Sequence, residues 1–256
     1  MKKIICITGA SSGFGEACAY KFSENDYDLI ISGRREEKLI ALKAILEKKF
    51  RNRVHVMRLD VSDRNAVEKA FKSLPDEWKK IDLLLNNAGL AAGRDNFDEA
   101  SVDDWEKMID TNLKGLLYVS KAVLPYMIAG KTGHVINIGS TAGKQVYQKG
   151  NVYCATKHAV QAISEAMRID LLPHKIKVTV IHPGAAETEF SLVRLKHNVE
   201  EAKKVYEGYE PLHAKDIADV VYFTASLPPH VCINELEMTC LAQANSFYLF
   251  KPKAQN

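Results

Sequence analysis

Apolar segments of strand length alternate with segments of helical periodicity along the chain. The strand-like segments are residues 3–8, 27–33, 53–61, 81–89, 134–140, 177–184 and 234–240. Helical spacing runs over residues 15–24, 35–50, 64–73, 102–129, 151–172 and 213–227. This alternation predicts βαβ units and a parallel sheet, and the near-continuous Ile, Leu and Val of the strands indicate that both sheet faces are covered. We therefore predict an α/β fold: residues 1–256 as a single domain, with one doubly wound parallel sheet and helices on both faces.

The regular alternation loosens after Gly184. Residues 188–210 mix charges of both signs, and VEEAKKVYEGY (199–209) has helical spacing. Ligands of open α/β sheets bind outside the carboxyl ends of the strands, and this segment follows such an end. We expect it to form a mobile cover over a substrate site. The tail KPKAQN (251–256) is expected to be frayed.

Charge and cysteine usage narrow the classes of partner and compartment. A net charge of +3 is too small to indicate nucleic acid or an anionic membrane as a partner. No apolar run approaches the roughly 18 residues of a membrane helix, and the first apolar run breaks early into Gly and Ser, which favours a strand over a signal peptide. The cysteines are scattered without a CxxC pair: Cys6, Cys18, Cys154, Cys232 and Cys240. This pattern predicts a reduced cytoplasmic protein without a disulfide framework or a metal site.

A glycine-rich turn, TGASSGFG (8–15), joins the first predicted strand to the first predicted helix. Gly9, Gly13 and Gly15 allow a tight turn and a close approach of a ligand to the backbone. The free N–H groups and the dipole of a helix start suit a pyrophosphate. The spacing GxxxGxG differs from the GxGxxG fingerprint, and no Gly-Lys-Ser/Thr follows, so nucleotide hydrolysis has no support. We predict that the turn binds a dinucleotide.

The end of the second predicted strand indicates which dinucleotide. An NAD site usually has an acidic residue here for the ribose hydroxyls, whereas this chain has Arg34 and Arg35. Two guanidinium groups suit a 2′-phosphate. The alternative, solvated charges at a helix start, is disfavoured because cations there oppose the helix dipole. We therefore predict NADP(H). Two roles stay open for Asp60: binding the adenine amino group, or capping the next helix in competition with Ser62 and Asp63.

Tyr153 and Lys157 lie four residues apart in GNVYCATKHAV (150–160) and share one face of a predicted helix. An unperturbed phenol titrates near ~10, and a cation one turn away favours its phenolate form. The spacing alone is common in ordinary amphipathic helices. The pair becomes an acid/base candidate only together with other motifs.

Those motifs are present in a fixed order: TGASSGFG, NNAG (86–89), Asn112, Ser140, Tyr153-x-x-x-Lys157 and Pro183-Gly184. In them the chain resembles the short-chain dehydrogenase/reductase family, from residue 3 to about 190. The resemblance implies a Rossmann-like domain that assembles as dimers or tetramers. It implies that Tyr153 is the catalytic acid/base and that Ser140 holds the substrate oxygen. It also implies that Lys157 binds the nicotinamide ribose and biases Tyr153 towards phenolate, and that the backbone of Asn112 holds a relay water.

The same resemblance, with the residue chemistry above, extends the cofactor site along the carboxyl edge of the sheet. Its predicted members are Gly9, Ser11, Ser12, Gly13, Phe14, Gly15, Arg34, Arg35, Asp60, Val61, Asn87, Ala88, Gly89, Tyr153, Lys157, Pro183, Gly184 and Thr188. In reduction we expect Tyr153 to protonate the carbonyl oxygen while Ser140 hydrogen-bonds it. Simpler roles remain for single motifs: Ser140 as a turn cap, and Asn86-Asn87 as turn residues.

A closer similarity is to the NADP-dependent 3-hydroxy acid dehydrogenases, the branch that includes serine and L-allo-threonine dehydrogenases. It is carried by GFGE (13–16), SGRREEKL (32–39), NNAGLA (86–91), INIGSTAG (136–143), GNVYCATK (150–157), PGAAETEFSLVR (183–194) and INELEM (233–238). It implies hydride transfer between NADP and the 3-hydroxyl or 3-oxo carbon of a small hydroxy acid, such as serine, L-allo-threonine or 3-hydroxypropionate.

Such a substrate needs a cation for its carboxylate. Arg194, in the predicted cover, is the candidate, and a solvated charge beside Lys196 is the alternative. Residues between Ser140 and Tyr153 are expected to border the pocket. The predicted substrate site is therefore Ser140, Gln145, Tyr147, Gln148, Tyr153 and Arg194.

Two rival functions are weighed against this one. The last strands of 3-oxoacyl-carrier-protein reductases are typically Gly-rich, and NELEMTCLAQ (234–243) does not match them. A catalytically silent NADPH-binding sensor or scaffold usually lacks part of the Ser/Tyr/Lys set, which is intact here.

Small residues recur on the helix that carries Tyr153, at Ala155, Ala159, Ala162 and Ala166. Small faces let helices approach closely. The stripe either packs on the protein's own sheet or meets a partner subunit, and the resemblance favours a homotetramer, with a homodimer as the alternative.

Overall fold

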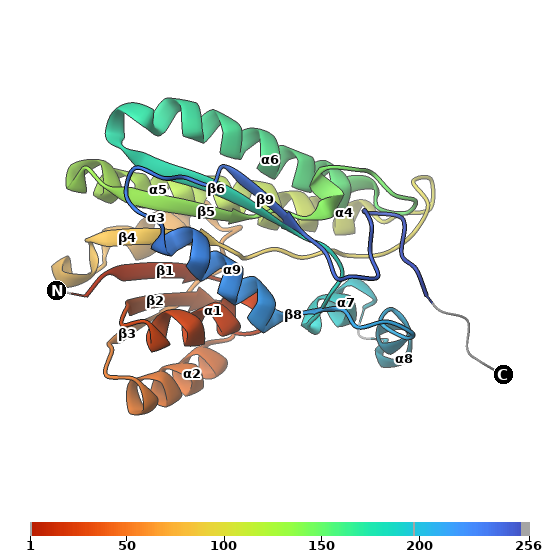
Figure 1. Ribbon diagram of the computed structural model, residues 1–256, viewed down its shortest axis with the longest axis horizontal. Coiled ribbons are helices and arrows are strands. Elements are labelled where there is room, and N and C mark those ends of the chain that lie inside the picture. The colour runs from red at the N-terminus through yellow and green to blue at the C-terminus, as the bar shows by residue number, and fades with distance from the viewer. Residues whose placement is uncertain (1, 197, 252–256) are drawn as a thin grey trace.

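A parallel sheet forms the centre of the protein (Figure 1), whose computed structural model describes residues 2–196 and 198–251. The strands lie in the order β3-β2-β1-β4-β5-β6-β9, and each hydrogen-bonded pair is parallel. Their bounds are β1 Ile4–Thr8, β2 Asp28–Gly33, β3 Val54–Arg58, β4 Ile81–Asn86, β5 Gly133–Ile138, β6 Ile176–Pro183 and β9 Glu235–Met238. The strand order reverses between β1 and β4, where ligands of open α/β sheets bind. The predicted doubly wound parallel sheet is confirmed.

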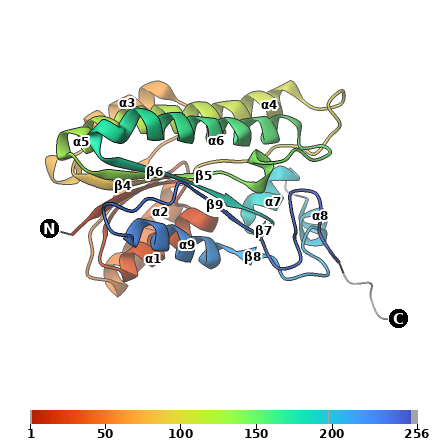
Figure 2. The same ribbon diagram turned by 45° about the horizontal axis from the view of Figure 1, so that its top comes forward.

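Helices cover both faces of this sheet (Figure 2). One layer holds α1 Gly13–Glu24, α2 Glu36–Lys49 and α9 Ala214–Ser226; the other holds α3 Arg64–Lys72, α4 Val102–Ile109, α5 Leu116–Gly130 and α6 Asn151–Leu171. Successive strand residues enter opposite cores: Ile5 and Ile7 pack towards α1, whereas Ile4 and Cys6 pack towards α5. Because both faces are buried, the strands are apolar throughout instead of alternating.

The predicted helix 102–129 is interrupted. A π-helical turn, Asp110–Gly115, separates α4 from α5. At Gly115 the helix comes so close to the loop after β3 that a Cβ would lie 2.7 Å from Val61 Cγ2. The wider turn contains Asn112, which is buried beneath the sheet edge. Prediction of one unbroken helix was wrong here, because apolar spacing does not register a single inserted residue.

Two short strands that the hydrophobic pattern did not predict lie after β6. β7 Ala186–Glu187 pairs in parallel with β8 Leu212–His213. Between them, at one end of the molecule, lie α7 Glu189–Arg194 and α8 Val199–Lys204, within the segment predicted to be a cover (Figure 1). The remaining helical turns are of the 3-10 type: Asp76–Trp78, Thr141–Gly143 and Leu172–His174. The tail predicted to be frayed is residues 251–256. All of it except residue 251 lies outside the described residues.

Three further observations concern the described part of the chain. None of its helices has the length and apolar character to cross a membrane. Nowhere in residues 2–196 and 198–251 do three or more His, Cys, Asp or Glu side chains gather in a way that would hold a metal ion. Each of the five cysteines is a free thiol.

Candidate active site

A cavity of about 1120 Å³ opens at the carboxyl edge of the sheet, between the strand ends and α7. Most of the residues predicted for a cofactor or substrate line it: Gly9, Ser11, Ser12, Gly13, Phe14, Arg34, Arg35, Asp60, Val61, Asn87, Ala88, Gly89, Ser140, Tyr147, Gln148, Tyr153, Lys157, Pro183, Gly184, Thr188 and Arg194. Three predicted residues do not line it: Gly15, Asn112 and Gln145. A cavity of this size exceeds what a single small molecule needs.

The glycine-rich turn shapes one end of the cavity. Gly9 and Gly13 have φ angles of +68° and +57°, in the left-handed region that glycine adopts without strain. Gly15 serves packing instead, because a Cβ there would collide with the carbonyl oxygen of Gly9. Thr8, which the sequence did not single out, accepts hydrogen bonds from the backbone N–H groups of Asn87 and Ala88, both at 3.0 Å. The turn is thereby fixed to the end of β4.

Arg35 lies against this turn. Its Nη2 donates to Ser12 Oγ at 2.6 Å, its Nε to Ser11 Oγ at 3.2 Å and its Nη1 to Glu189 Oε2 at 2.8 Å. Lys38 Nζ holds the other oxygen of Glu189 at 3.0 Å. Arg35 is therefore paired with groups of the turn and of α7, whereas Arg34 is exposed at the edge of the cavity. A phosphate at this end of the cavity would meet both guanidinium groups.

Glu189, on the first turn of α7, is a contact that sequence reasoning missed. Partial burial by itself would raise the pKa of this carboxyl, but hydrogen bonds from Arg35, Lys38 and Ser12 outweigh it and lower the pKa to about 2. The carboxylate thus joins the cover to the cations of the second strand end. Its partners lie about 150 positions earlier in the chain, so no local motif could have indicated the pairing.

The two roles left open for Asp60 are partly resolved. Asp63 is the residue that caps α3, since its Oδ1 accepts from Ala66 N at 3.0 Å. Asp60 Oδ1 accepts from the backbone N–H and the hydroxyl of Ser62, at 3.0 and 2.7 Å. Asp60 therefore shapes the loop and still faces the cavity.

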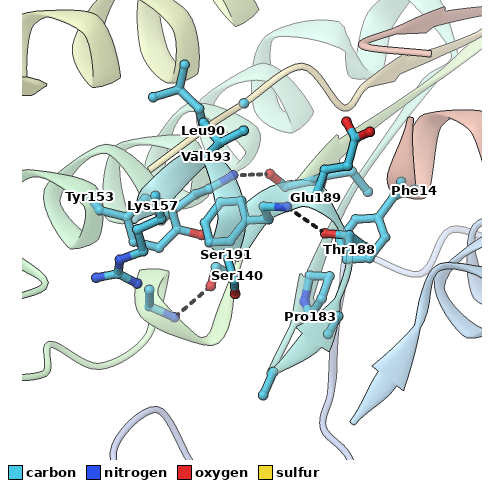
Figure 3. Close-up of a pocket in the computed structure, with 18 of the residues that line it drawn as sticks. Phe14, Leu90, Ser140, Tyr153, Lys157, Pro183, Thr188, Glu189, Ser191 and Val193 are labelled. Atoms are coloured by element: carbon cyan, nitrogen blue, oxygen red, sulfur yellow. Dashed lines mark hydrogen bonds between the residues drawn. The ribbon is translucent and has the colours of Figure 1, made fainter. Parts of the chain in front are cut away.

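Tyr153 and Lys157 are buried on the first two turns of α6, and Figure 3 shows them beside Ser140. Lys157 Nζ lies 5.9 Å from the centre of the Tyr153 ring and donates to the carbonyl oxygen of Ile138 at 2.9 Å. Burial lowers the pKa of Lys157 to about 8. The helix thus brings the pair to one face, as the spacing predicted.

The acidity of Tyr153 differs from the simple expectation. Burial, and then the neighbouring Tyr147, raise the pKa of this phenol above its ordinary value. A hydrogen bond with the Ser140 side chain and the charge of Arg194 lower it, but by less. The chain's own residues therefore keep Tyr153 protonated at neutral pH. Lys157, whose ammonium group donates to the Ile138 carbonyl, is not among the groups that lower the pKa of this phenol.

Ser140 follows β5 and has two functions at once. Its Oγ accepts from Ala142 N at 3.1 Å, so it does cap the following 3-10 turn. The same side chain lies close enough to Tyr153 to lower the pKa of the phenol, and it lines the cavity. The cap orients the hydroxyl group towards the phenol, so the structural role and the predicted chemical role are compatible.

Arg194, at the end of α7, reaches over the tyrosines. Its Nη1 donates to Tyr147 Oη at 2.8 Å, and its guanidinium carbon lies 5.5 and 5.6 Å from the ring centres of Tyr147 and Tyr153. Its Nε is buried and has no hydrogen-bond partner among the described residues. Lys196, in contrast, pairs with Asp104 at 2.9 Å. Arg194 is therefore not a solvated charge beside Lys196, and its buried Nε is left unpaired within the described residues.

Asn112 and Gln145 lie behind the cavity wall. The side chain of Asn112 accepts from Leu90 N and donates to Leu90 O, both at 2.8 Å, and also donates to Thr156 Oγ1 at 3.2 Å. It joins the loop after β4 to α6 and so supports the helix that carries Tyr153. Gln145 Oε1 accepts from Ser246 N at 3.4 Å, so Gln145 binds the C-terminal segment and does not border the pocket as predicted.

Comparison with known proteins decides the family. The family model described as short chain dehydrogenase matches residues 3–198. The chain belongs to this family. It is 48% identical over 242 residues to the NADP-dependent 3-hydroxy acid dehydrogenase of Salmonella typhi, covering 94% of this chain and 96% of the relative. It is 42% identical over 249 residues to sulfoacetaldehyde reductase 2 of Chromohalobacter salexigens, covering 97% and 98%.

A solved structure, the closed form of serine dehydrogenase complexed with NADP+, superimposes on this short-chain dehydrogenase with a TM-score of 0.92. The sequence identity is 44%, and the match covers 98% of this chain and all of that chain. The structural match therefore includes the C-terminal segment after β9, which lies outside residues 3–198 matched by the family model.

That C-terminal segment contributes to the cavity in a way the sequence did not indicate. Six of its residues line the cavity: Gln243, Asn245, Ser246, Phe247, Leu249 and Lys251. Gln243 Oε1 accepts from Ala185 N at 2.7 Å, and any side chain at Gly184 would collide with this oxygen. The segment closes the cavity next to Pro183-Gly184 without carrying a motif of its own.

Proposed function

We propose that this short-chain dehydrogenase is an NADP-dependent oxidoreductase that transfers hydride between the nicotinamide and the 3-hydroxyl or 3-oxo carbon of a small hydroxy acid. The observation that carries the proposal is Arg194, whose guanidinium carbon lies 5.6 Å from the centre of the Tyr153 ring and whose buried Nε has no hydrogen-bond partner among the described residues. An anion bound there has its neighbouring carbon chain next to the hydroxyl groups of Tyr153 and Ser140. The names of the relatives, a 3-hydroxy acid dehydrogenase and a sulfoacetaldehyde reductase, both describe small substrates with an anionic group.

The residues present fit NADP(H). Gly9 and Gly13 open the turn at the start of α1, where backbone N–H groups and the helix dipole suit a pyrophosphate. Arg35, held by Ser11 and Ser12, supplies the cation for a 2′-phosphate, and no carboxylate ends β2. When bound, the nicotinamide supplies or accepts the hydride.

The protein's own contribution is proton transfer and stabilisation of charge. Tyr153 is protonated at neutral pH, so in reduction its hydroxyl donates a proton to the substrate oxygen. The Ser140 hydroxyl hydrogen-bonds the same oxygen as negative charge develops there. Oxidation requires the phenolate, and the charge of Arg194 close to the ring, together with the positive charge that a bound oxidised nicotinamide would carry, favours it.

We propose that residues 188–210 act as a cover that completes the site. Its first helix contacts both ends of the cavity, through Glu189 with Arg35 and through Arg194 with Tyr147. A segment held mainly by such polar contacts opens at lower cost than a packed core element. Opening would admit the substrate, and closing would bring Arg194 to its anion.

We further propose a cytoplasmic homotetramer built from chains that each fold as one domain over residues 1–256. Five free thiols suit a reducing compartment. On α6, Ala155, Ala162 and Ala166 are exposed, and Ile169 and Leu172 beyond them are 70% and 68% exposed. This apolar surface lies on a different side of α6 from Tyr153, which supports a subunit contact there.

Arg194→Ala tests the substrate class. Because the variant removes a charge-assisted hydrogen bond worth about 1.5–3 kcal/mol, we expect kcat/KM for 3-hydroxypropionate to fall roughly 10- to 100-fold, mainly through KM. Oxidation of 1,3-propanediol, which lacks the carboxylate, should change by less than about threefold. Lys196→Ala, in the same segment, is the matched control. An equal loss on both substrates would show that Arg194 does not bind the anion.

A further inference from the structure

His182 lies directly behind Ser140, at the end of β6, and its side chain is fully buried. Its Nδ1 is 2.8 Å from the carbonyl oxygen of Ser140 and 3.2 Å from the backbone N of the same residue. A Cβ at Gly139 would lie 2.6 Å from this Nδ1. The imidazole is thus packed against the peptide that carries the catalytic hydroxyl, and only glycine leaves room for it.

The other ring nitrogen has a defined role. His182 Nε2 lies 2.7 Å from Gln161 Oε1. The amide nitrogen of Gln161 donates to two carboxylates, Glu165 Oε1 at 2.6 Å and Glu235 Oε2 at 2.8 Å. This fixes the orientation of the amide, so that its oxygen faces the histidine. His182 Nε2 therefore carries a hydrogen in either protonation state, and Nδ1 is the atom that titrates.

The titration of Nδ1 changes its partner. In the neutral ring, the Nδ1 lone pair accepts from the N–H of Ser140 and is repelled by the carbonyl oxygen. In the protonated ring, Nδ1–H donates to the carbonyl oxygen of Ser140 and no longer accepts from the N–H. The two states pull the same peptide in different directions.

We propose that His182 is a positioning residue whose protonation state selects the Ser140 backbone group it binds, and thereby sets the position of the Ser140 hydroxyl. Its effect on turnover rests on the proposed function. Its effect on the Ser140 peptide does not.

Charged groups around His182 set the pH range of this change. On β9, Glu235 lies 4.0 Å from Nε2 and Glu237 is the register partner of His182. Lys144 pairs with Glu235, and Glu165 acts only through Gln161. Burial lowers the pKa of His182 below its ordinary 6.5, against the opposing effects of the Ser140 backbone and Glu235. The neutral state therefore prevails at pH 7, and the change falls on the acid side.

The first test compares pH profiles of kcat in the parent enzyme, His182→Gln and His134→Gln. His134 is the matched control, a buried histidine at the other end of the sheet whose Nε2 contacts Thr179. We expect His182→Gln to lower kcat about tenfold, because displacement of a catalytic group by less than 1 Å costs that much, with KM within about twofold. The parent and His134→Gln should both lose kcat on the acid side. His182→Gln should show no such fall. An unchanged profile in His182→Gln would overturn the proposal.

The second test needs no substrate. We expect the NMR shifts of the Ser140 amide and of the His182 ring to change with pH at one common midpoint. Glu235→Gln, which removes the neighbouring carboxylate and leaves Ser140 intact, should move both midpoints to lower pH. If the Ser140 amide does not follow His182, the proposal is wrong. Common midpoints in a protein without turnover would leave this inference standing and refute the proposed function.

Discussion

At the scale of single residues, the site consists of ionisable groups that burial has moved away from their ordinary pKa values. Tyr153 and Lys157 are each 7% exposed, and desolvation is the largest effect on both. It raises the pKa of the phenol and lowers that of the ammonium group, because in each case the charged form loses hydration. The two pKa values, which are nearly equal for the free groups, are thereby moved apart, so the phenol stays protonated while the lysine titrates closer to neutral pH.

The lowered pKa of the buried Lys157 should make the free energy of unfolding depend on pH. Burial lowers the pKa of Lys157 from 10.5 to about 8. Between these values the unfolded chain still binds the proton that the folded protein has released, so the free energy of unfolding rises with pH. We expect the free energy of unfolding of the parent minus that of Lys157→Met to increase by up to about 3 kcal/mol from pH 7 to pH 11. Urea titrations at both pH values measure it, and a difference independent of pH would exclude a lowered pKa.

At the scale of elements, the π-helical turn between α4 and α5 places a polar side chain where an α-helix would not. Asn112 satisfies both backbone groups of Leu90 and reaches Thr156 on α6. The loop after β4, which lines the cavity, is joined to α6 through this amide.

Asn112→Ala should therefore destabilise the protein markedly. It leaves two buried backbone groups of Leu90 without partners, each costing about 1–3 kcal/mol, so we expect a loss of roughly 2–6 kcal/mol in the free energy of unfolding by urea. Asn96→Ala is the control, since its exposed amide binds only Glu99, and its effect should stay within about 0.5 kcal/mol. Equal effects of the two variants would refute the bridging role.

The elements that could be predicted are those with a strong period. Every predicted strand is present because burial on both faces makes it uniformly apolar. β7 and β8 have two residues each, too few for a period, and form only because the chain returns to the same edge. The single inserted residue at Asp110–Gly115 is likewise invisible to spacing.

The residues of the site likewise fall into those that the sequence could predict and those that it could not. Ser140, Tyr153 and Lys157 could be named because their chemistry requires fixed residue types at fixed spacing. Glu189 and His182 could not, because their roles depend on partners 154 and 42 positions away. Gln145 was wrongly placed in the pocket, since a loop position between two site residues does not determine where a side chain points.

At the scale of the whole molecule, the carboxyl edge of the sheet gathers contributions from the first turn of the chain to residue 251. Arg35 is the point where three of them meet: the glycine-rich turn, the start of α2 and the cover. Loss of this side chain should affect the phosphorylated cofactor selectively.

We expect Arg35→Ala to weaken NADP binding about 10- to 100-fold, the equivalent of one charged hydrogen-bonding group, and to leave NAD binding within about threefold. Calorimetric titration of both cofactors measures the ratio, and the NADP-dependent rise in Tm should shrink accordingly. Arg64→Ala is the control, because that arginine pairs with Glu68 on the surface of α3. Equal losses for NADP and NAD would refute recognition of a 2′-phosphate by Arg35.

The most direct measurement is steady-state oxidation of 3-hydroxypropionate, L-serine and L-allo-threonine, each with NADP and with NAD, by the parent enzyme and by Tyr153→Phe. The variant keeps the ring that packs against Phe190 and removes only the hydroxyl. We predict turnover with NADP on at least one of these acids and a loss of about 10²- to 10⁴-fold in the variant. Turnover that survives in Tyr153→Phe, or that requires NAD, would contradict the proposed function.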